Sequence, residues 1–263
     1  MSALETSPLT TRIAQAGLDW IVPDWTVPGA VQALVTTRVG GVSLGARRAM
    51  DLGGAETPDE AVTENRRRLR RFLPADPQWL RQVHGAEVAV LDATSAANAW
   101  PAADAAVTRT PGVVCAVRIA DCLPVFLADA RGDMVAVAHA GWRGLVAGVL
   151  TTTLATMERL GSGPERLVAW LGPAIGPAAF EVGPEVRDAF CMRNTAALTC
   201  FTPGRAGKWY ADLYALAALQ LHDAGVRTSS GGGWCTHADA SRFFSYRRER
   251  DTGRMAALIW LSS

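Results

Sequence analysis

Two histidines and one cysteine stand where apolar runs give way to turns. His84 lies in RQVHG directly before Gly85, and His139 lies in VAVAHAGWRG just before Gly141. Cys122 lies between two apolar runs in RIADCLPVF. Zinc prefers imidazole nitrogen and thiolate sulfur, and a catalytic zinc site keeps one coordination position open. The three residues therefore predict an open zinc site. Copper is a second candidate for the same ligands because it binds such donors more tightly than zinc does.

The long gaps between these ligands are unlike those of a zinc finger, where ligand pairs lie a few residues apart. An isolated histidine or cysteine is more often structural, so the neighbouring residues matter. Asp121 directly precedes Cys122, and Asp104 lies in PAADAAVT. A carboxylate near a ligating imidazole can fix its tautomer and orientation, which favours the metal site.

Arg143 follows His139 closely, within AGWRG, on a turn that is expected to open a helix. An arginine beside the free N–H groups of a helix N-terminus is typical of an anion site. The alternative is a surface arginine stacked on Trp142.

Several apolar runs are expected to position these residues. Alternation predicts a strand over 31–38, and the pattern of 61–73 predicts a helix with a basic outer face. Four runs rich in β-branched residues predict adjacent, buried strands: EVAVLDA, VVCAVRIA, LPVFLAD and MVAVAHA. The segment 145–161 is then expected to form a helix that ends at Gly161.

The last third of the chain shows a strand that starts near Arg166 and breaks at two Gly-Pro steps. Helices are predicted from Pro184 and from Tyr210, with a bend at 231–233. The turn at 251–253 predicts a hairpin. The arginines beside this turn are expected to form its solvated face: Arg247, Arg248 and Arg250. No long linker interrupts the chain, so residues 1–263 are predicted to form one α+β domain of mixed sheets with helices outside them.

The composition limits the classes of partner. The 263 residues carry a formal net charge of +1, which does not favour nucleic acid or an anionic membrane. Five irregularly spaced cysteines argue against a disulfide framework, and the N-terminus lacks the pattern of a secretion signal. A cytoplasmic location is therefore expected.

Six motifs follow one another in the order found in the YfiH family, whose members are also called laccase-domain or multicopper polyphenol oxidase proteins. They are RQVHG, ADAAVTRTPG, RIADCLPVFLAD, VAVAHAGWRGLVAGV, LGPAIGPAAFEVGPEV and CTHADASRFFSYRRERDTGR. The resemblance spans about Thr36 to Leu258. It implies a layered α/β/β/α fold, with His84, Cys122 and His139 as metal ligands. The segment after GGVS departs from the family pattern and lacks a histidine usually found there.

The resemblance implies a zinc-dependent purine nucleoside phosphorylase that acts on adenosine, inosine, guanosine and methylthioadenosine, with adenosine deaminase activity alongside. Nucleoside and phosphate would be its partners, and a homodimer is a possible oligomeric state. Arg38, Gln82 and Arg143 are the candidates for substrate binding. Cys122, Asp121 and Arg143 are the catalytic candidates, with Asp121 or Glu181 as the proton shuttle of a deamination.

Two other activities remain as alternatives. A cytoplasmic peptidoglycan-editing amidase acting on UDP-MurNAc-amino acid precursors could use the same metal, or Cys122 as a nucleophile paired with His139. Copper-dependent oxidation of polyphenols is disfavoured, because several copper centres need more histidines than the four in this chain. The remaining cysteines are expected to have no catalytic role. Cys235 and His237 resemble ligands, but the family gives them no such role.

Overall fold

The computed structural model describes residues 7–54, 58–95 and 99–262. Its largest sheet has six strands in the order β12-β8-β6-β7-β4-β3. The strands are β12 (Thr228–Gly231), β8 (Leu167–Leu171), β6 (Leu123–Asp129), β7 (Val135–Ala140), β4 (Ala105–Thr108) and β3 (Val88–Leu91). The pairs β6–β7 and β6–β8 are antiparallel. Every residue of β6 and β7 is buried, which explains why both strands read as continuous apolar runs.

A second sheet has the order β1-β13-β5-β2 and packs face to face against the first. Its strands are β1 (Val31–Val35), β13 (Met255–Leu261), β5 (Val114–Ile119) and β2 (Pro77–Gln78). Side chains from both sheets fill the layer between them, such as Phe126 and Trp170 from one and Val117 and Ile259 from the other. This inner layer fixes the distance between the two sheets.

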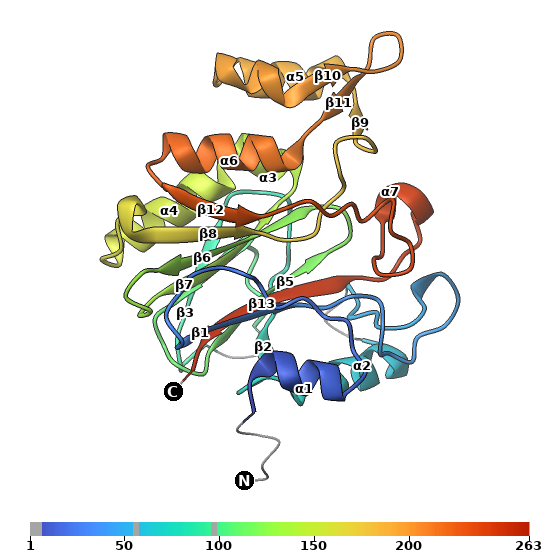
Figure 1. Cartoon of the computed structure of the whole chain (residues 1–263), viewed down its shortest axis with the longest axis vertical. Helices are drawn as coiled ribbons and strands as arrows, with labels where there is room; N and C mark the ends of the chain where they lie inside the picture. Colours follow the sequence, from blue (N-terminus) through green and yellow to red (C-terminus); the bar gives the residue numbers. More distant parts are fainter. Residues whose placement is uncertain (1–6, 55–57, 96–98, 263) are drawn as a thin grey trace.

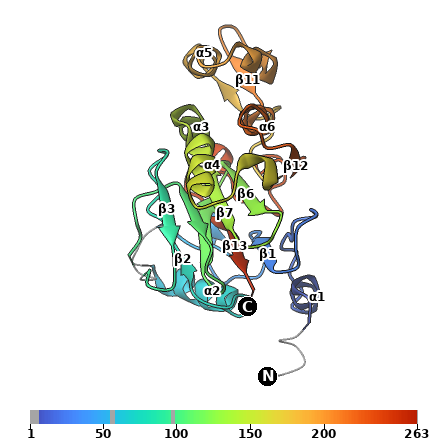
Figure 2. The same ribbon diagram turned by 90° about the vertical axis from the view of Figure 1, so that its left-hand side faces the viewer.

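Helices cover the outer face of each sheet (Figures 1 and 2). The six-stranded sheet is covered by α3 (Trp142–Ala147), α4 (Val149–Arg159) and α6 (Leu213–Asp223). The four-stranded sheet is covered by α1 (Leu9–Gln15) and α2 (Glu60–Arg70), which bury a third apolar cluster. The fold is therefore α+β with α/β/β/α layers, as predicted.

A small third sheet lies beyond α6, at the top of Figure 1. It has the order β10-β11-β9 and packs beside α5 and a 3-10 helix. These elements are β9 (Glu181–Val182), α5 (Pro184–Cys191), η3 (Thr195–Cys200), β10 (Phe201–Pro203) and β11 (Trp209–Ala211). Two further 3-10 helices are η1 (Gly45–Arg47) and η2 (Pro164–Arg166).

Several predicted elements need correction. The four apolar runs are strands, but they are not all adjacent: β5 belongs to the second sheet, and β4 joins β3 to β7. The helix predicted over 145–161 is broken at Gly148, whose φ of 94° caps α3 before α4 begins. The helix predicted from Tyr210 starts at Leu213, where the Asp212 side chain caps it.

The predicted C-terminal hairpin is wrong. The segment before the turn forms α7 (Tyr246–Glu249), because the Ser245 hydroxyl accepts a hydrogen bond from the Arg248 N–H and caps a helical turn. β13 pairs with β1 and β5 instead of folding back on its own precursor. All seven residues of β13 are buried. A central position in the sheet keeps these apolar side chains from water, whereas an exposed hairpin would not.

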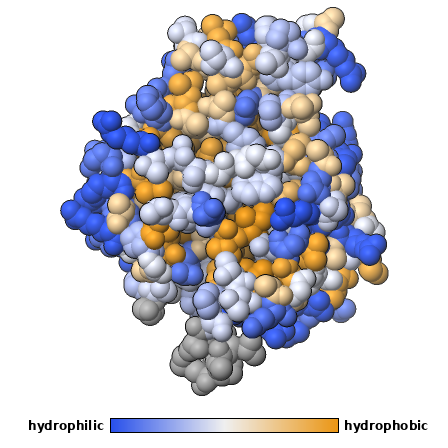
Figure 3. Space-filling view, in the orientation of Figure 1, coloured by the Kyte–Doolittle hydropathy of each residue, from blue (hydrophilic) through white to orange (hydrophobic). Residues whose placement is uncertain are grey.

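The surface shown in Figure 3 is hydrophilic along its two lateral margins, with apolar residues between them. Among the described residues, no helix is both long and apolar enough to cross a membrane.

Candidate metal centre and its cavity

The antiparallel pairing of β6 and β7 brings Cys122 and His139 to one edge of the six-stranded sheet. Pro124 of β6 pairs with His139 of β7, and Cys122 stands directly before β6. His84 approaches the same edge from the loop that precedes β3, with a left-handed φ of 59°. Two strand ends and one loop therefore converge on a single place.

The three side chains are close enough to share one ion. One ligand atom from each of His84, Cys122 and His139 lies within 4.8 Å of the other two. The Cys122 sulfur is 3.9 Å from Nε2 of His84, and the two imidazole rings meet edge to face with centroids 5.0 Å apart. Two imidazoles and one thiolate form a donor set that suits zinc or copper, so the predicted trio fits a metal ion.

Gly141 makes this close approach possible. A Cβ at this position would lie 2.7 Å from the Cys122 sulfur and 3.5 Å from a ring carbon of His84. Its backbone φ of −67° is ordinary, so the requirement for glycine comes from space and not from backbone conformation. The glycine of AHAGWRG therefore leaves room for the thiol.

Asp104 holds two of the proposed ligands in place. Its buried carboxylate accepts hydrogen bonds from Nδ1 of His139 at 2.9 Å and from the N–H groups of Val83 and Gly85 on either side of His84. Bonding through Nδ1 leaves Nε2 of His139 as the metal-facing nitrogen. Burial alone would raise the pKa of Asp104, but these hydrogen bonds and the charge of His139 hold the pKa below its ordinary value.

We expect Asp104→Asn to weaken metal binding by about 10- to 100-fold, because it removes the anionic acceptor that orients His139 and the His84 loop. The amide would also place its own N–H groups against donors that are already buried. Competition for zinc with a chromophoric chelator measures the affinity. Asp133→Asn, on the exposed turn before β7, is the matched control and should bind zinc as the parent does. An unchanged affinity in Asp104→Asn would contradict this role.

Cys122 and His139 also stabilise one another's charged forms. Burial would raise the pKa of the Cys122 thiol, but the charge of His139 and hydrogen bonds with both histidines lower it below its ordinary value. Burial would lower the pKa of His139, yet the Cys122 charge and the hydrogen bond to Asp104 raise it. A thiol that ionises this readily is a good metal ligand.

Asp121 has a positioning role in this geometry. Its φ is 90°, and its two carboxylate oxygens accept hydrogen bonds from the Thr236 hydroxyl at 2.6 Å and from the backbone N–H of Arg247 at 2.7 Å. Its backbone carbonyl accepts a further bond from Ile175 N–H. Three separate segments are therefore tied to the turn that carries Cys122.

The proposed ligands line a cavity of about 560 Å³. That volume is within the range of small-molecule sites. The lining includes four arginines and several apolar or aromatic side chains: Arg118, Arg143, Arg247, Arg254, Trp142, Phe180, Leu213 and Tyr246. The cavity therefore combines flat apolar surfaces with positive charge beside the His/Cys/His group.

Two of the predicted substrate-binding residues line this cavity. The Arg143 guanidinium lies 4.5 Å from the Trp142 ring centroid, so it both stacks and faces the cavity. The Gln82 side-chain amide exchanges two hydrogen bonds with the backbone of Arg118, which fixes the loop before His84 to β5. Gln82 thus lines the cavity, but its side-chain amide is already hydrogen-bonded to the backbone of Arg118.

Arg38 and Glu181 are not among the lining residues. The Arg38 guanidinium donates to the carbonyls of Arg48 and Ala240 and stacks on Phe244, which gives it a structural role. Glu181 belongs to β9 and pairs with Arg205 at 3.5 Å. The geometry therefore does not support Arg38 as a substrate ligand or Glu181 as a proton shuttle.

Sequence reasoning missed the contribution of the C-terminal segment. Arg247 is exposed, as expected, but it belongs to α7 instead of a hairpin, and it lines the cavity together with Tyr246 and Arg254. Arg248, in contrast, is no solvated residue, because its guanidinium donates to three backbone carbonyls around α7. The FFSYRR stretch was the available signal, because it belongs to one of the six motifs that resemble the YfiH family.

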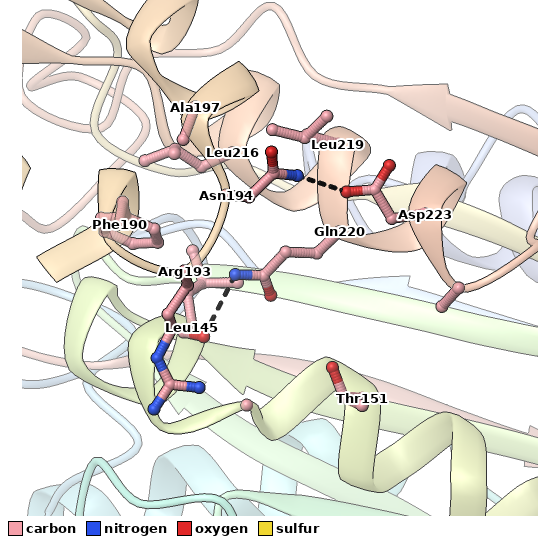
Figure 4. A pocket seen from close by; sticks show the side chains of 12 residues that line it. Leu145, Thr151, Phe190, Arg193, Asn194, Ala197, Leu216, Leu219, Gln220 and Asp223 are labelled. Carbon is pink, nitrogen blue, oxygen red and sulfur yellow. Dashed lines mark hydrogen bonds between the residues drawn. The ribbon is translucent and has the colours of Figure 1, made fainter.

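Two other cavities lie away from the metal-ligand group. One of about 290 Å³ lies between α3, α5 and α6, where Asn194 donates to Asp223 and Gln220 donates to the Leu145 carbonyl (Figure 4). The other, of about 650 Å³, is lined by Cys235 and His237 beside the glycines at 231–233. Within the described ranges, only His84, Cys122 and His139 form a group of three metal-binding side chains.

A cavity with one His/Cys/His group at the edge of two stacked sheets defines a protein that can hold a single metal ion. The chain matches the family model described as multi-copper polyphenol oxidoreductase laccase over residues 32–262 and belongs to this family. The resemblance to YfiH proteins is thereby confirmed.

Curated relatives and a solved structure agree with this assignment. A purine nucleoside phosphorylase of Pseudomonas aeruginosa is 49% identical over 244 residues, which cover 92% of this chain and 98% of that protein. The purine nucleoside phosphorylase YfiH of Escherichia coli is 49% identical over 245 residues, with the same coverage. A crystal structure of a Neisseria meningitidis protein superposes with a TM-score of 0.87 at 47% identity, covering 93% of this chain and 100% of that one.

Proposed function

We propose that this chain is a zinc-dependent purine nucleoside phosphorylase that acts on adenosine, inosine, guanosine and methylthioadenosine. The names of its relatives support the reaction. The observation that carries the proposal is the position of Arg143: it lines the same cavity as the His/Cys/His group. Phosphorolysis needs an anion site for phosphate beside the glycosidic carbon, and Arg143 offers the fork of donors that such an anion prefers.

The bond changes of phosphorolysis set the tasks of these residues. A phosphate oxygen bonds to C1′ of the ribose, the bond from C1′ to the base nitrogen breaks, and its electron pair leaves with the base. Arg143 would hold the phosphate in line with C1′ while Trp142 fixes the plane of its guanidinium. Phe180 and Tyr246 would offer flat faces against which a purine can lie.

The three proposed ligands, His84, Cys122 and His139, would hold the zinc ion on the cavity wall. When bound, the ion would supply positive charge that offsets the negative charge of phosphate and of the transition state. Asp104 would keep His139 in the tautomer that binds through Nε2. Asp121 would hold α7 against the turn that carries Cys122.

The same donor set supports adenosine deamination as a second reaction of this site, because zinc deaminases use histidine and cysteine ligands. Polyphenol oxidation at several copper centres has no comparable support. Of the two remaining histidines, His222 is exposed on α6 and His237 lines a different cavity.

One assay tests the phosphorylase directly. Zinc-loaded protein is given inosine with and without phosphate, and the products are separated by chromatography. The expected products are hypoxanthine and ribose 1-phosphate, and only with phosphate present. Cleavage that ignores phosphate, or no cleavage of any of the four nucleosides, would refute the proposal. A parallel reaction with UDP-MurNAc-L-Ser detects the amidase activity that is the main alternative.

We expect Arg143→Lys to reduce kcat/KM for phosphate by about 30- to 150-fold, equivalent to about 2–3 kcal/mol. Lysine keeps the charge but loses the two parallel N–H donors. Zinc content should stay at the parental value, because Arg143 is not a ligand. Arg131→Lys, on the exposed turn after β6, serves as the control and should behave as the parent. Unchanged phosphate dependence in Arg143→Lys would remove Arg143 from the phosphate site.

A further inference from the structure

Three arginines reach the cavity from three different elements. Arg143 belongs to α3, Arg247 belongs to α7, and Arg254 directly precedes β13. Within residues 7–54, 58–95 and 99–262, none of these three guanidinium groups pairs with a carboxylate. Of the described lining residues, Asp121 alone carries a carboxylate, and both its oxygens already accept hydrogen bonds. The positive charge of this wall is therefore not balanced by the wall itself.

The two C-terminal arginines keep donors that face no described partner. Nη1 of Arg247 donates to the Glu181 carbonyl, and Nη1 of Arg254 donates to the carbonyls of Thr252 and Gly253. A guanidinium has five N–H groups, so both side chains retain further donors. Carbonyl partners are neutral, so they orient a guanidinium without neutralising it.

Aromatic rings position both guanidinium groups, and a partly buried backbone hydrogen bond also holds Arg247. The guanidinium carbon of Arg247 lies 5.2 Å from the Phe180 ring centroid, and that of Arg254 lies 5.9 Å from the Tyr246 centroid. The backbone N–H of Arg247 donates to the carboxylate of Asp121, the neighbour of Cys122. The two arginines are therefore positioned relative to the metal-ligand group, as a built binding site requires.

The positive charge of the cavity lining, together with a bound zinc ion, is larger than the negative charge of one phosphate ion. Outside the His/Cys/His trio, Arg143, Arg247 and Arg254 bring three positive charges to the wall, and Asp121 brings one negative charge. A zinc ion with one thiolate would add further positive charge. Inorganic phosphate brings a charge of about −1.5 to −2, by analogy with a phosphate ester. A ligand with a second anionic group would match the wall better.

We propose that Arg247 and Arg254 form a second anion subsite, which binds a phosphate group carried by the organic substrate itself. The substrate class then extends from nucleosides to nucleotides, with Arg143 left to hold inorganic phosphate beside the metal. The nucleoside part of this substrate rests on the proposed function. The anion subsite rests on the geometry of the C-terminal segment alone.

Equilibrium binding of adenosine and AMP to the zinc-loaded full chain tests the subsite. Isothermal titration at low salt should show AMP binding about 100-fold tighter than adenosine, the scale of two charge-assisted contacts. Arg247→Gln and Arg254→Gln should each reduce this ratio by about tenfold. Arg250→Gln, in the same segment but outside the cavity lining, should leave it unchanged. The ratio compares two ligands on one protein, so partial misfolding of a variant cannot imitate the effect.

Competition with inorganic phosphate separates the two anion positions. Saturating phosphate should weaken AMP binding less than threefold if Arg143 and the Arg247–Arg254 pair act at different places. Equal affinities for AMP and adenosine would overturn the proposal. So would full competition by phosphate together with loss of the AMP preference in Arg143→Lys. If AMP is preferred but inosine is not cleaved, the phosphorylase fails and the subsite stands. If inosine is cleaved without an AMP preference, the subsite fails alone.

Discussion

Cys122→Ala should purify with almost no zinc and should lose at least about 1000-fold in zinc affinity. Structural zinc sites bind with about 10–16 kcal/mol, so the loss of the thiolate from a set of three ligands removes several kcal/mol. Activity should fall with the metal, because His84 and His139 alone leave the ion weakly held. Elemental analysis of the purified protein, followed by titration with a competing chelator, measures both quantities.

Cys191→Ala is the matched control for this change. Cys191 is a free, half-buried thiol at the end of α5, remote from the His/Cys/His group. The control should keep the parental zinc content of one ion per chain and the parental activity. Full zinc content in Cys122→Ala would exclude Cys122 as a ligand, whatever its effect on activity.

Gly141→Ala should disable the site although it removes no ligand. The new methyl group would lie 2.7 Å from the Cys122 sulfur, a separation that requires the thiol or the backbone to move. We expect zinc affinity to fall by about 100-fold, similar to the loss of a supporting residue. The crowding should also cost about 1–3 kcal/mol of unfolding free energy. Zinc competition and urea denaturation measure the two effects.

Gly29→Ala controls for the substitution itself. A Cβ at Gly29 meets nothing within 4 Å, and its φ lies outside the left-handed region. This variant should match the parent in zinc affinity and in stability. If Gly141→Ala matched the parent as well, the close approach of glycine and thiol would have no importance for the centre.

The metal-ligand group was accessible to sequence reasoning because Cys122 and His139 stand at the ends of apolar strands, although His84 proves to lie in the loop before β3. Strand ends gather at the edges of a sheet, and histidine or cysteine at such places limits the chemistry to a few classes. The partner of His139 was also predictable in kind, since Asp104 was noted as a carboxylate that could orient an imidazole. Its simultaneous bonds to Val83 and Gly85 depend on the left-handed turn at His84, which no local pattern indicates.

The arginines that line the cavity could not be predicted from the sequence in the same way. Asp121 and Arg247 are 126 residues apart in sequence, and the bond between them places α7 at the cavity. The turn residues at 251–253 predicted a hairpin, because a hairpin can be inferred from local sequence. The contact between Asp121 and Arg247 cannot be inferred from local sequence. The prediction that β5 lies in the same sheet as its sequence neighbours was wrong for a related reason. β5 has a similar apolar sequence, but it pairs with β13 from the end of the chain. A continuous apolar run predicts a buried strand, but it does not predict which strands are its neighbours in a sheet.

Removal and return of the metal test the central claim most directly. The protein is stripped with a chelator, and inosine phosphorolysis is measured while zinc is added back. If His84, Cys122 and His139 hold the ion that the reaction needs, activity falls to background and returns at one zinc per chain. Full activity in the stripped protein, abolished by iodoacetamide labelling of Cys122, would contradict the account and assign the chemistry to a cysteine nucleophile.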